Sequence, residues 1–184
     1  MSKLKNSSLL VIVILLFCCI TYCKGQDSIL EEVKHFIPKS AIQNEIRVFK
    51  GDLNRDDLED IILRFKLTNE PEYQEHVYLL IGQKNGKYEL GAKNDSLEFD
   101  NVDGTVFDKI VIKNGYFSLE YIGYGNTSGS YEIITFKYSD IDKSWYLHRK
   151  GSKLIHRYFT EGDLKENIST QKDFGKILFQ DYSY

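Results

Sequence analysis

Two Asn-Gly dipeptides constrain the fold of this chain more than any other feature of its sequence. Asn85-Gly86 follows the apolar residues 77–81, and Asn114-Gly115 precedes the alternating residues 116–122. An Asn-Gly pair between apolar runs is typical of a two-residue β-hairpin turn, because both residues tolerate a positive φ. The sequence therefore predicts two antiparallel hairpins, one around each dipeptide.

Neighbouring segments extend this pattern. Residues 61–67 alternate between apolar and other side chains, which predicts a half-buried strand. Residues 131–138 and 145–149 flank a polar turn and predict a third hairpin. A short helix is expected at residues 28–37, because apolar side chains recur there every four residues and Pro38 follows. We therefore expect an α+β fold, mainly one antiparallel sheet built as a meander of hairpins, with one N-terminal helix.

The C-terminal tail carries weaker patterns. Residues 153–159 predict a further strand, and residues 163–168 predict a helical turn. Thr170 is followed three residues later by Asp173, a spacing that can cap another short helical turn. A last strand is expected at residues 177–179.

The first 25 residues differ from the rest of the chain. Lys3 and Lys5 give a positive start, residues 9–20 are continuously apolar, and no acidic residue precedes Asp27. This order is typical of a secretory signal peptide, and the apolar run is shorter than the roughly 20 residues of a membrane span. We expect residues 1–25 to be the signal peptide and residues 26–184 to form a single globular β-rich domain. The mature protein would then be periplasmic or extracellular, without a transmembrane span.

Every cysteine of the chain lies in this leader, at Cys18, Cys19 and Cys23. The mature chain is therefore expected to contain no disulfide, thiol nucleophile or cysteine-ligated metal. An alternative is that one of these cysteines carries a lipid, which would leave the protein anchored at the envelope. A membrane tether is expected only in that case.

Charge narrows the choice of partner. The chain has 24 basic and 27 acidic residues, and loss of Lys3, Lys5 and Lys24 with the leader leaves 21 against 27, a net charge of −6. An acidic chain without a basic run is a poor candidate for nucleic-acid binding.

Residues 51–60, GDLNRDDLED, form the motif with the most specific chemistry. Its oxygen-bearing positions alternate, and a tight loop can supply calcium with hard oxygen ligands in this way. Leu58 stands at position seven of the loop, where calcium needs only a backbone carbonyl. The alternative is a set of Asx turns, in which the same side chains bond nearby backbone amides. The predicted ligands of a structural calcium ion are Asp52, Asn54, Asp56, Leu58 and Asp60.

This segment resembles the calcium loops of FG-GAP and VCBS-like extracellular repeats. Asp57 stands where that family has glycine, at a position that usually requires positive φ, so the resemblance implies a weakened calcium affinity. Together with LLIGQKNGKYELGAKND, IKNGYFSLEY, IITFKY and WYLH, the loop also resembles a family of small exported bacterial proteins of unknown function. That resemblance implies an exported location and brings no catalytic residues with it.

Residues 121–131, YIGYGNTSGSY, have the composition of a recognition loop. Tyrosine offers a large contact area at low entropic cost, and small polar residues adapt their hydrogen bonds. The predicted partner-binding residues are Tyr121, Tyr124, Asn126 and Tyr131. The alternative is a plain hairpin loop whose tyrosines belong to the core.

Catalytic patterns are weak in this sequence. The four histidines have no metal-ligand spacing, and Glu120 is explained by outward-facing alternation on a strand. We therefore expect a non-catalytic exported envelope protein that binds a protein partner. The alternatives are a glycan-binding or adhesion accessory module, a periplasmic toxin-immunity protein, and a small hydrolase with a carboxylate pair.

Overall fold

A computed structural model of the chain describes residues 29–71, 74–98, 105–124, 128–156 and 166–183. The chain divides into two compact units, Met1–Ile37 and Pro38–Tyr184. In the first unit, residues 29–33 form an α-helix that continues into the 3-10 helix η1 (Lys34–Phe36). This confirms the predicted N-terminal helix. The predicted signal peptide and its cysteines lie outside the described residues.

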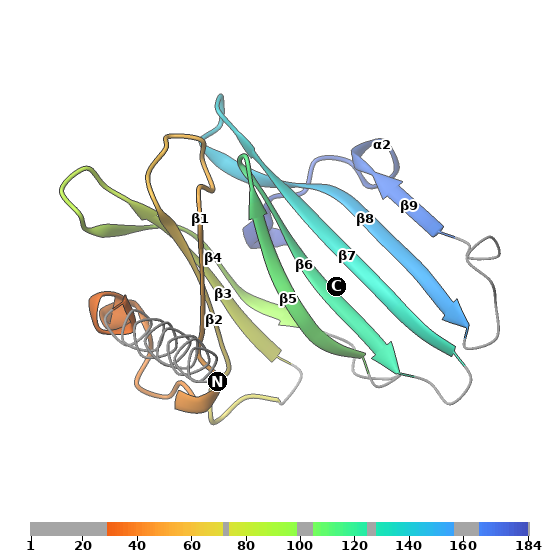
Figure 1. The fold of residues 1–184 in the computed structure, drawn as a ribbon, viewed down its shortest axis with the longest axis horizontal. Coiled ribbons are helices and arrows are strands. Elements are labelled where there is room, and N and C mark those ends of the chain that lie inside the picture. Colours follow the sequence, from red (N-terminus) through yellow and green to blue (C-terminus); the bar gives the residue numbers. More distant parts are fainter. Residues whose placement is uncertain (1–28, 72–73, 99–104, 125–127, 157–165, 184) are drawn as a thin grey trace, which may run out of the picture. The chain divides into compact units, whose positions relative to one another are not determined.

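The second unit is dominated by antiparallel strands (Figure 1). The described strands form a four-stranded sheet, in the order β1-β2-β3-β4, and a five-stranded sheet, in the order β5-β6-β7-β8-β9. None of the described helices is long and apolar enough to cross a membrane. The strands are β1 (Arg47–Gly51), β2 (Asp60–Phe65), β3 (Gln74–Gly82), β4 (Tyr88–Glu98), β5 (Thr105–Lys113), β6 (Tyr116–Tyr124), β7 (Ser128–Ser139), β8 (Ser144–His156) and β9 (Glu166–Thr170). The short helices are η2 (Gln43–Glu45), α2 (Gln171–Phe174) and η5 (Phe179–Asp181).

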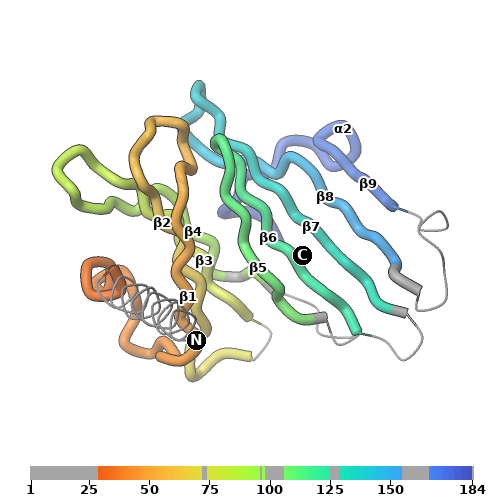
Figure 2. Tube along the Cα trace, viewed as in Figure 1, coloured from red at the N-terminus to blue at the C-terminus, as the bar shows by residue number. Residues whose placement is uncertain are grey.

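Local turn chemistry produces the hairpins, and all three predicted hairpins are confirmed. Asn114 and Gly115 have φ values of 53° and 73°, as a two-residue hairpin turn requires, and Gly86 has a φ of 77°. The polar turn between β7 and β8 ends at Lys143, which also has a positive φ. Within each sheet every strand pairs with its neighbour in sequence, and the chain trace shows this order clearly for β5 to β9 (Figure 2).

The expected single sheet is wrong, because the meander is divided between β4 and β5. Side chains from both sheets, together with the C-terminal segment, form one apolar core between them. Strand β2 was expected to be half buried, yet all six of its residues are buried. Ile62 belongs to this core, whereas Ile61, Leu63 and Phe65 are buried on the opposite face of the strand. The fully buried core includes Leu53, Ile62, Leu79, Leu97, Phe117, Leu119, Tyr121, Phe136 and Phe179.

The tail differs in part from the prediction. Strand β8 runs to His156, so the expected strand at 145–149 and residues 153–156 of the next expected strand are one element, while residues 157–159 lie outside the described residues. Residues 166–168 belong to β9 rather than to a helical turn. Thr170 and Asp173 do form a capping box at α2, as predicted. The expected last strand is a single bridge between Leu178 and Tyr146, followed by η5.

Candidate functional site

The acidic loop, residues 51–60, connects β1 to β2 and folds around its first aspartate. Asp52 Oδ1 accepts hydrogen bonds from the backbone amides of Asn54 (3.2 Å) and Arg55 (2.5 Å), and its Oδ2 accepts one from Asp57 (3.3 Å). These bonds replace the water that would otherwise solvate the amides of a tight turn.

The middle of the loop uses its side chains in the same way. Asn54 Oδ1 accepts a hydrogen bond from the Asp56 amide at 3.1 Å, and Asp56 Oδ1 accepts one from the Leu58 amide at 2.9 Å. Arg55 and Asp57 have φ values of 67° and 63°. Asp57 therefore has the positive φ that the sequence predicted at this position, in a region that favours glycine and tolerates aspartate.

Asp60, the last residue of the loop, carries its side chain in the interior of the fold. Its side chain is fully buried, and its two oxygens accept hydrogen bonds from the amides of Leu53 (2.7 Å) and Gly82 (2.8 Å). Burial raises the pKa of this carboxyl to about 6, although the two backbone hydrogen bonds act in the opposite direction. Asp60 thus ties the loop to the end of β3.

These hydrogen bonds have the pattern of the Asx-turn alternative. Among the described residues, no group of three or more His, Cys, Asp or Glu side chains is arranged to hold a metal ion. Asn54 Nδ2 donates to Asp56 Oδ2 at 2.8 Å, so two of the predicted ligands bond each other. Calcium binding by the loop stays a prediction, and it requires these carboxylates to exchange backbone partners for the ion.

The loop also joins distant parts of the second unit. The Leu53 carbonyl accepts a hydrogen bond from Trp145 Nε1 at 2.9 Å, and the Asp52 carbonyl accepts one from the Gly115 amide at 3.3 Å. Arg55 forms an ion pair with Asp140 in the β7–β8 turn. The loop therefore connects the first sheet to two hairpin turns of the second.

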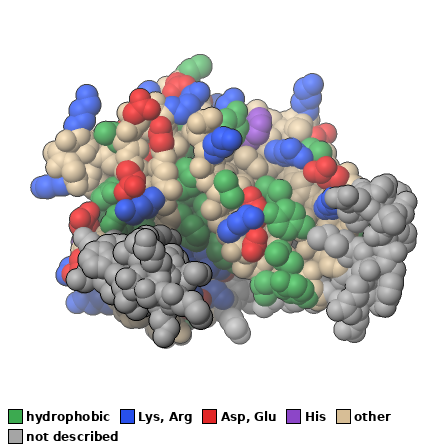
Figure 3. All heavy atoms as spheres, in the orientation of Figure 1, with side chains coloured by type: hydrophobic (Ala, Val, Ile, Leu, Met, Phe, Trp, Pro, Cys, Tyr) green, Lys and Arg blue, Asp and Glu red, His purple; other side chains and the backbone are tan. Residues whose placement is uncertain are grey.

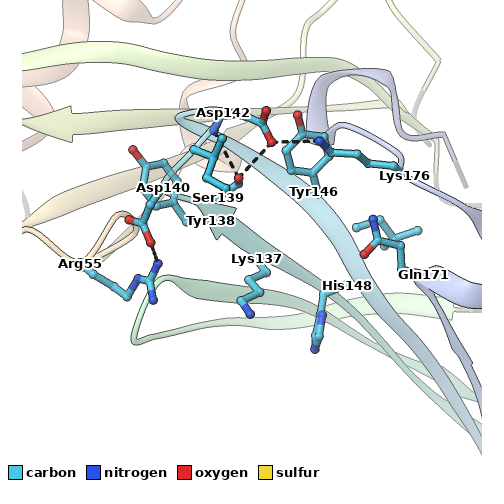
Figure 4. A pocket seen from close by; sticks show the side chains of 12 residues that line it. Arg55, Lys137, Tyr138, Ser139, Asp140, Asp142, Tyr146, His148, Gln171 and Lys176 are labelled. Carbon is cyan, nitrogen blue, oxygen red and sulfur yellow. Dashed lines mark hydrogen bonds and ion pairs between the residues drawn. The ribbon is translucent and has the colours of Figure 1, made fainter.

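A pocket of about 530 Å³ lies beside this junction, between the β7–β8 turn, β8 and the segment that follows α2 (Figure 4). Most of its charges are paired, because Lys176 donates to Asp142 at 2.9 Å and Arg55 pairs with Asp140. Burial, followed by the charges of Lys137 and Arg149, lowers the pKa of His148, which favours a neutral imidazole. Lys137 has no carboxylate partner among the described residues, and its ammonium lies instead 5.3 Å from the ring centroid of Tyr116.

A broad surface lies on the side of the five-stranded sheet that faces away from the core. Residues paired across a ladder share a face, so the register assigns each side chain to the core or to the outside. We call this surface the outer face. Its members include Val106, Lys109, Val111 and Lys113 of β5; Tyr116, Ser118, Glu120, Ile122 and Tyr124 of β6; Gly129, Tyr131, Ile133, Thr135 and Lys137 of β7; Tyr146, Arg149, Gly151 and Lys153 of β8; and Glu166, Ile168 and Thr170 of β9.

The predicted recognition residues do not stay together. Tyr121 is 1% exposed and belongs to the core, so it is withdrawn from the predicted binding surface. Tyr124 is 67% exposed on the outer face, and Tyr131 lies half buried on the same face. Asn126 lies outside the described residues. The described residues of this segment, 121–124 and 128–131, are paired strand, so Tyr124 and Tyr131 belong to a sheet surface.

Glu120 is a buried carboxylate within this face. The side chain points outward, as predicted, but it is only 7% exposed because its neighbours cover it. Ser118 Oγ donates to Glu120 Oε1 at 3.1 Å, the Tyr131 hydroxyl donates to Oε2, and Lys109 Nζ lies 3.4 Å from Oε2. Burial and the adjacent Glu120 raise the pKa of Tyr131 to about 12, which keeps its hydroxyl protonated as a donor.

A hollow of about 300 Å³ lies next to this cluster, over Gly151. Ile133 and Ile168 are the register partners of Gly151 on either side, so the absent side chain leaves a depression between apolar neighbours. Arg149 borders the hollow and donates to Glu166 at 3.0 Å. Sequence reasoning missed this feature, although an isolated glycine within a strand is the pattern that marks such positions.

The outer face is visible from the viewpoint of Figure 3. Hydrophobic side chains gather over the lower parts of β5, β6 and β7, and Lys, Arg, Asp and Glu side chains lie among them. Four of the exposed large hydrophobic residues belong to this face: Val106, Val111, Tyr124 and Ile168. The surface thus combines apolar contact area with charged groups, as partner-binding surfaces do.

Comparison of the chain with protein-family models, with curated proteins and with solved structures found no match.

Proposed function

We propose that this protein is a non-catalytic exported envelope protein that binds a protein partner through the outer face of its β5–β9 sheet. Export rests on the signal-peptide pattern of residues 1–25. Binding rests on the outer face, which carries exposed apolar side chains and a hollow at Gly151. Contiguous exposed apolar surface rimmed by polar groups is characteristic of interaction sites.

A non-catalytic role is supported by the bonding of the buried carboxylates. Glu120 bonds Ser118 and Tyr131, and both oxygens of Asp60 bond backbone amides. A general acid or base has to reach a substrate proton, and these groups are already engaged in structural hydrogen bonds. We assign them to the support of the outer face and of the acidic loop.

The hollow offers a test that leaves the fold intact. A β-carbon added at Gly151 lies no closer than 3.9 Å to its nearest neighbour, the Arg149 side chain, and the φ of Gly151 is not positive. Valine suits a strand, so Gly151→Val should keep the melting temperature or raise it, by up to about 1 kcal/mol of stability. The added side chain fills the depression, and capture of the partner from envelope extract by immobilised protein should fall at least about tenfold.

Glu89→Val is the matched control. Glu89 is exposed on β4, in the other sheet, so this substitution adds the same side chain away from the outer face. A stoichiometric protein retained by the wild type and by Glu89→Val, but lost by Gly151→Val, supports the proposal. Equal capture by Gly151→Val and the wild type contradicts it.

A further inference from the structure

The outer face has a charge opposite to that of the whole chain. Its described cationic residues outnumber its acidic ones by five to three, when the bulge residue Asp108 is counted with Glu120 and Glu166. The predicted mature chain has a net charge of −6. Because the surroundings are acidic, a locally cationic surface directs an acidic partner to one place on the molecule. The five cations are Lys109, Lys113, Lys137, Arg149 and Lys153.

Three of these cations have no acidic partner among the described residues and are available for an ion pair with a bound protein. Lys109 lies within ion-pair distance of Asp108 and Glu120, and Arg149 pairs with Glu166. Lys113, Lys137 and Lys153 form no ion pair with another described residue. The Tyr116 ring supports Lys137, and that contact leaves the ammonium positively charged.

The positions of the three lysines require an extended ligand. Lys113 and Lys137 share one row across the sheet, separated by β6, which places their strands about 10 Å apart. Lys153 pairs with Tyr131, six residues before Lys137 on β7, a distance of about 20 Å along the strand. A small anion such as phosphate cannot bridge these positions, whereas a chain or surface with several carboxylates can.

The apolar residues of the outer face favour a polypeptide over a polysaccharide as the acidic ligand. Val111, Ile168 and Tyr124 are exposed on the same face, and Ile133 borders the hollow at Gly151. Burial of such side chains is favourable only against apolar groups, which protein side chains supply and uronic-acid polymers largely lack. Resting on the proposed function, we propose that the partner presents an acidic polypeptide surface with interspersed apolar side chains to the outer face.

Defined polymers test this proposal without the natural partner. The probes are a labelled glutamate–tyrosine copolymer, polyglutamate and polygalacturonate, with binding to the wild-type protein followed by fluorescence anisotropy at low and physiological salt. The glutamate–tyrosine copolymer should bind most tightly and polygalacturonate least, and higher salt should weaken all three because exposed charges are screened. Polygalacturonate binding as tight as that of the copolymer would assign the face to an anionic glycan and overturn the polypeptide claim.

Charge reversal then locates the binding. Lys137→Glu combined with Lys153→Glu should weaken copolymer binding at least about tenfold, with an unchanged melting temperature. Lys84→Glu combined with Lys87→Glu makes the same change in net charge on exposed residues of the β3–β4 turn, and should weaken binding far less. Equal losses in both double variants, or no copolymer binding by the wild type, would overturn the proposal. A basic partner lost by Gly151→Val would overturn this charge assignment and leave the proposed function standing.

Discussion

Asp60 carries its carboxyl group in the interior of the fold, where both oxygens accept hydrogen bonds from backbone amides. Burial disfavours the ionised form and raises the pKa to about 6, from an ordinary value of 3.8. A group whose pKa is raised by folding stabilises the fold fully below its unfolded pKa. That contribution is lost as the pH rises through the folded pKa.

Asp60→Asn should therefore change how stability depends on pH. Between about pH 4 and pH 6 the contribution of Asp60 to the free energy of unfolding falls with rising pH, by up to about 3 kcal/mol. The variant should be less stable overall, because the asparagine amide cannot accept both hydrogen bonds. Because asparagine does not titrate, the variant should also lose this part of the pH dependence. Urea unfolding across this pH range measures both effects, and parallel pH profiles for the two proteins would contradict the assignment.

The tyrosines show what could be read from single residues and what could not. Composition placed Tyr121 in a recognition segment, but it shares the phase of Phe117 and Leu119 on β6 and is therefore in the core. Strand phase would have found this, because alternate residues point to opposite faces. The cover over Glu120 could not be found in this way, since it depends on Tyr131 from the next strand.

Among the elements, hairpins were predictable and the division into two sheets was not. The Asn-Gly turns act locally, through positive φ at both Asn114 and Gly115 in one turn and at Gly86 in the other. Strands β1 and β9 are short edge strands. The two apolar residues of β1, Val48 and Phe49, are adjacent, and four of the five residues of β9 are exposed, so neither strand has the apolar alternation that identifies a strand. The break between β4 and β5 reflects packing of the two sheets on a shared core, a contact between residues far apart in sequence.

The acidic loop also acts as an element, and its predicted calcium site can be tested by thermal unfolding. Millimolar calcium should raise the melting temperature of the wild type, because an ion bound only to the folded state stabilises it. Asp52→Ala combined with Asp56→Ala should lower the melting temperature in EDTA as well, since each lost hydrogen bond costs about 1 kcal/mol, and should abolish the rise with calcium.

Asp57→Gly is the complementary variant. Asp57 has a φ of 63°, which glycine adopts without strain. The hydrogen bond to Asp52 Oδ2 comes from the backbone amide of Asp57, so glycine keeps it. This variant should keep the calcium response or enlarge it. A wild-type melting temperature that is the same in calcium and EDTA would contradict the calcium prediction and leave the loop as a set of Asx turns.

At the scale of the whole molecule, the outer face is a product of register. Its residues come from five strands, and four strand pairings have to be in phase before they share one surface. No local pattern in the sequence gives this phase relation, so the face became visible only with the strand pairing. The predicted mature chain has a negative net charge, whereas the described charges of the outer face are mainly positive and favour an acidic partner.

Lysine footprinting of the complex tests the central claim most directly. The captured partner is added to the protein, exposed amines are acetylated, and the loss of labelling at each lysine is measured by mass spectrometry. The outer-face lysines Lys113, Lys137 and Lys153 should be protected in the complex, and Lys84 and Lys87 of the β3–β4 turn should be labelled as in the free protein. Full labelling of the three outer-face lysines in a saturated complex would contradict the assignment of the partner to this face.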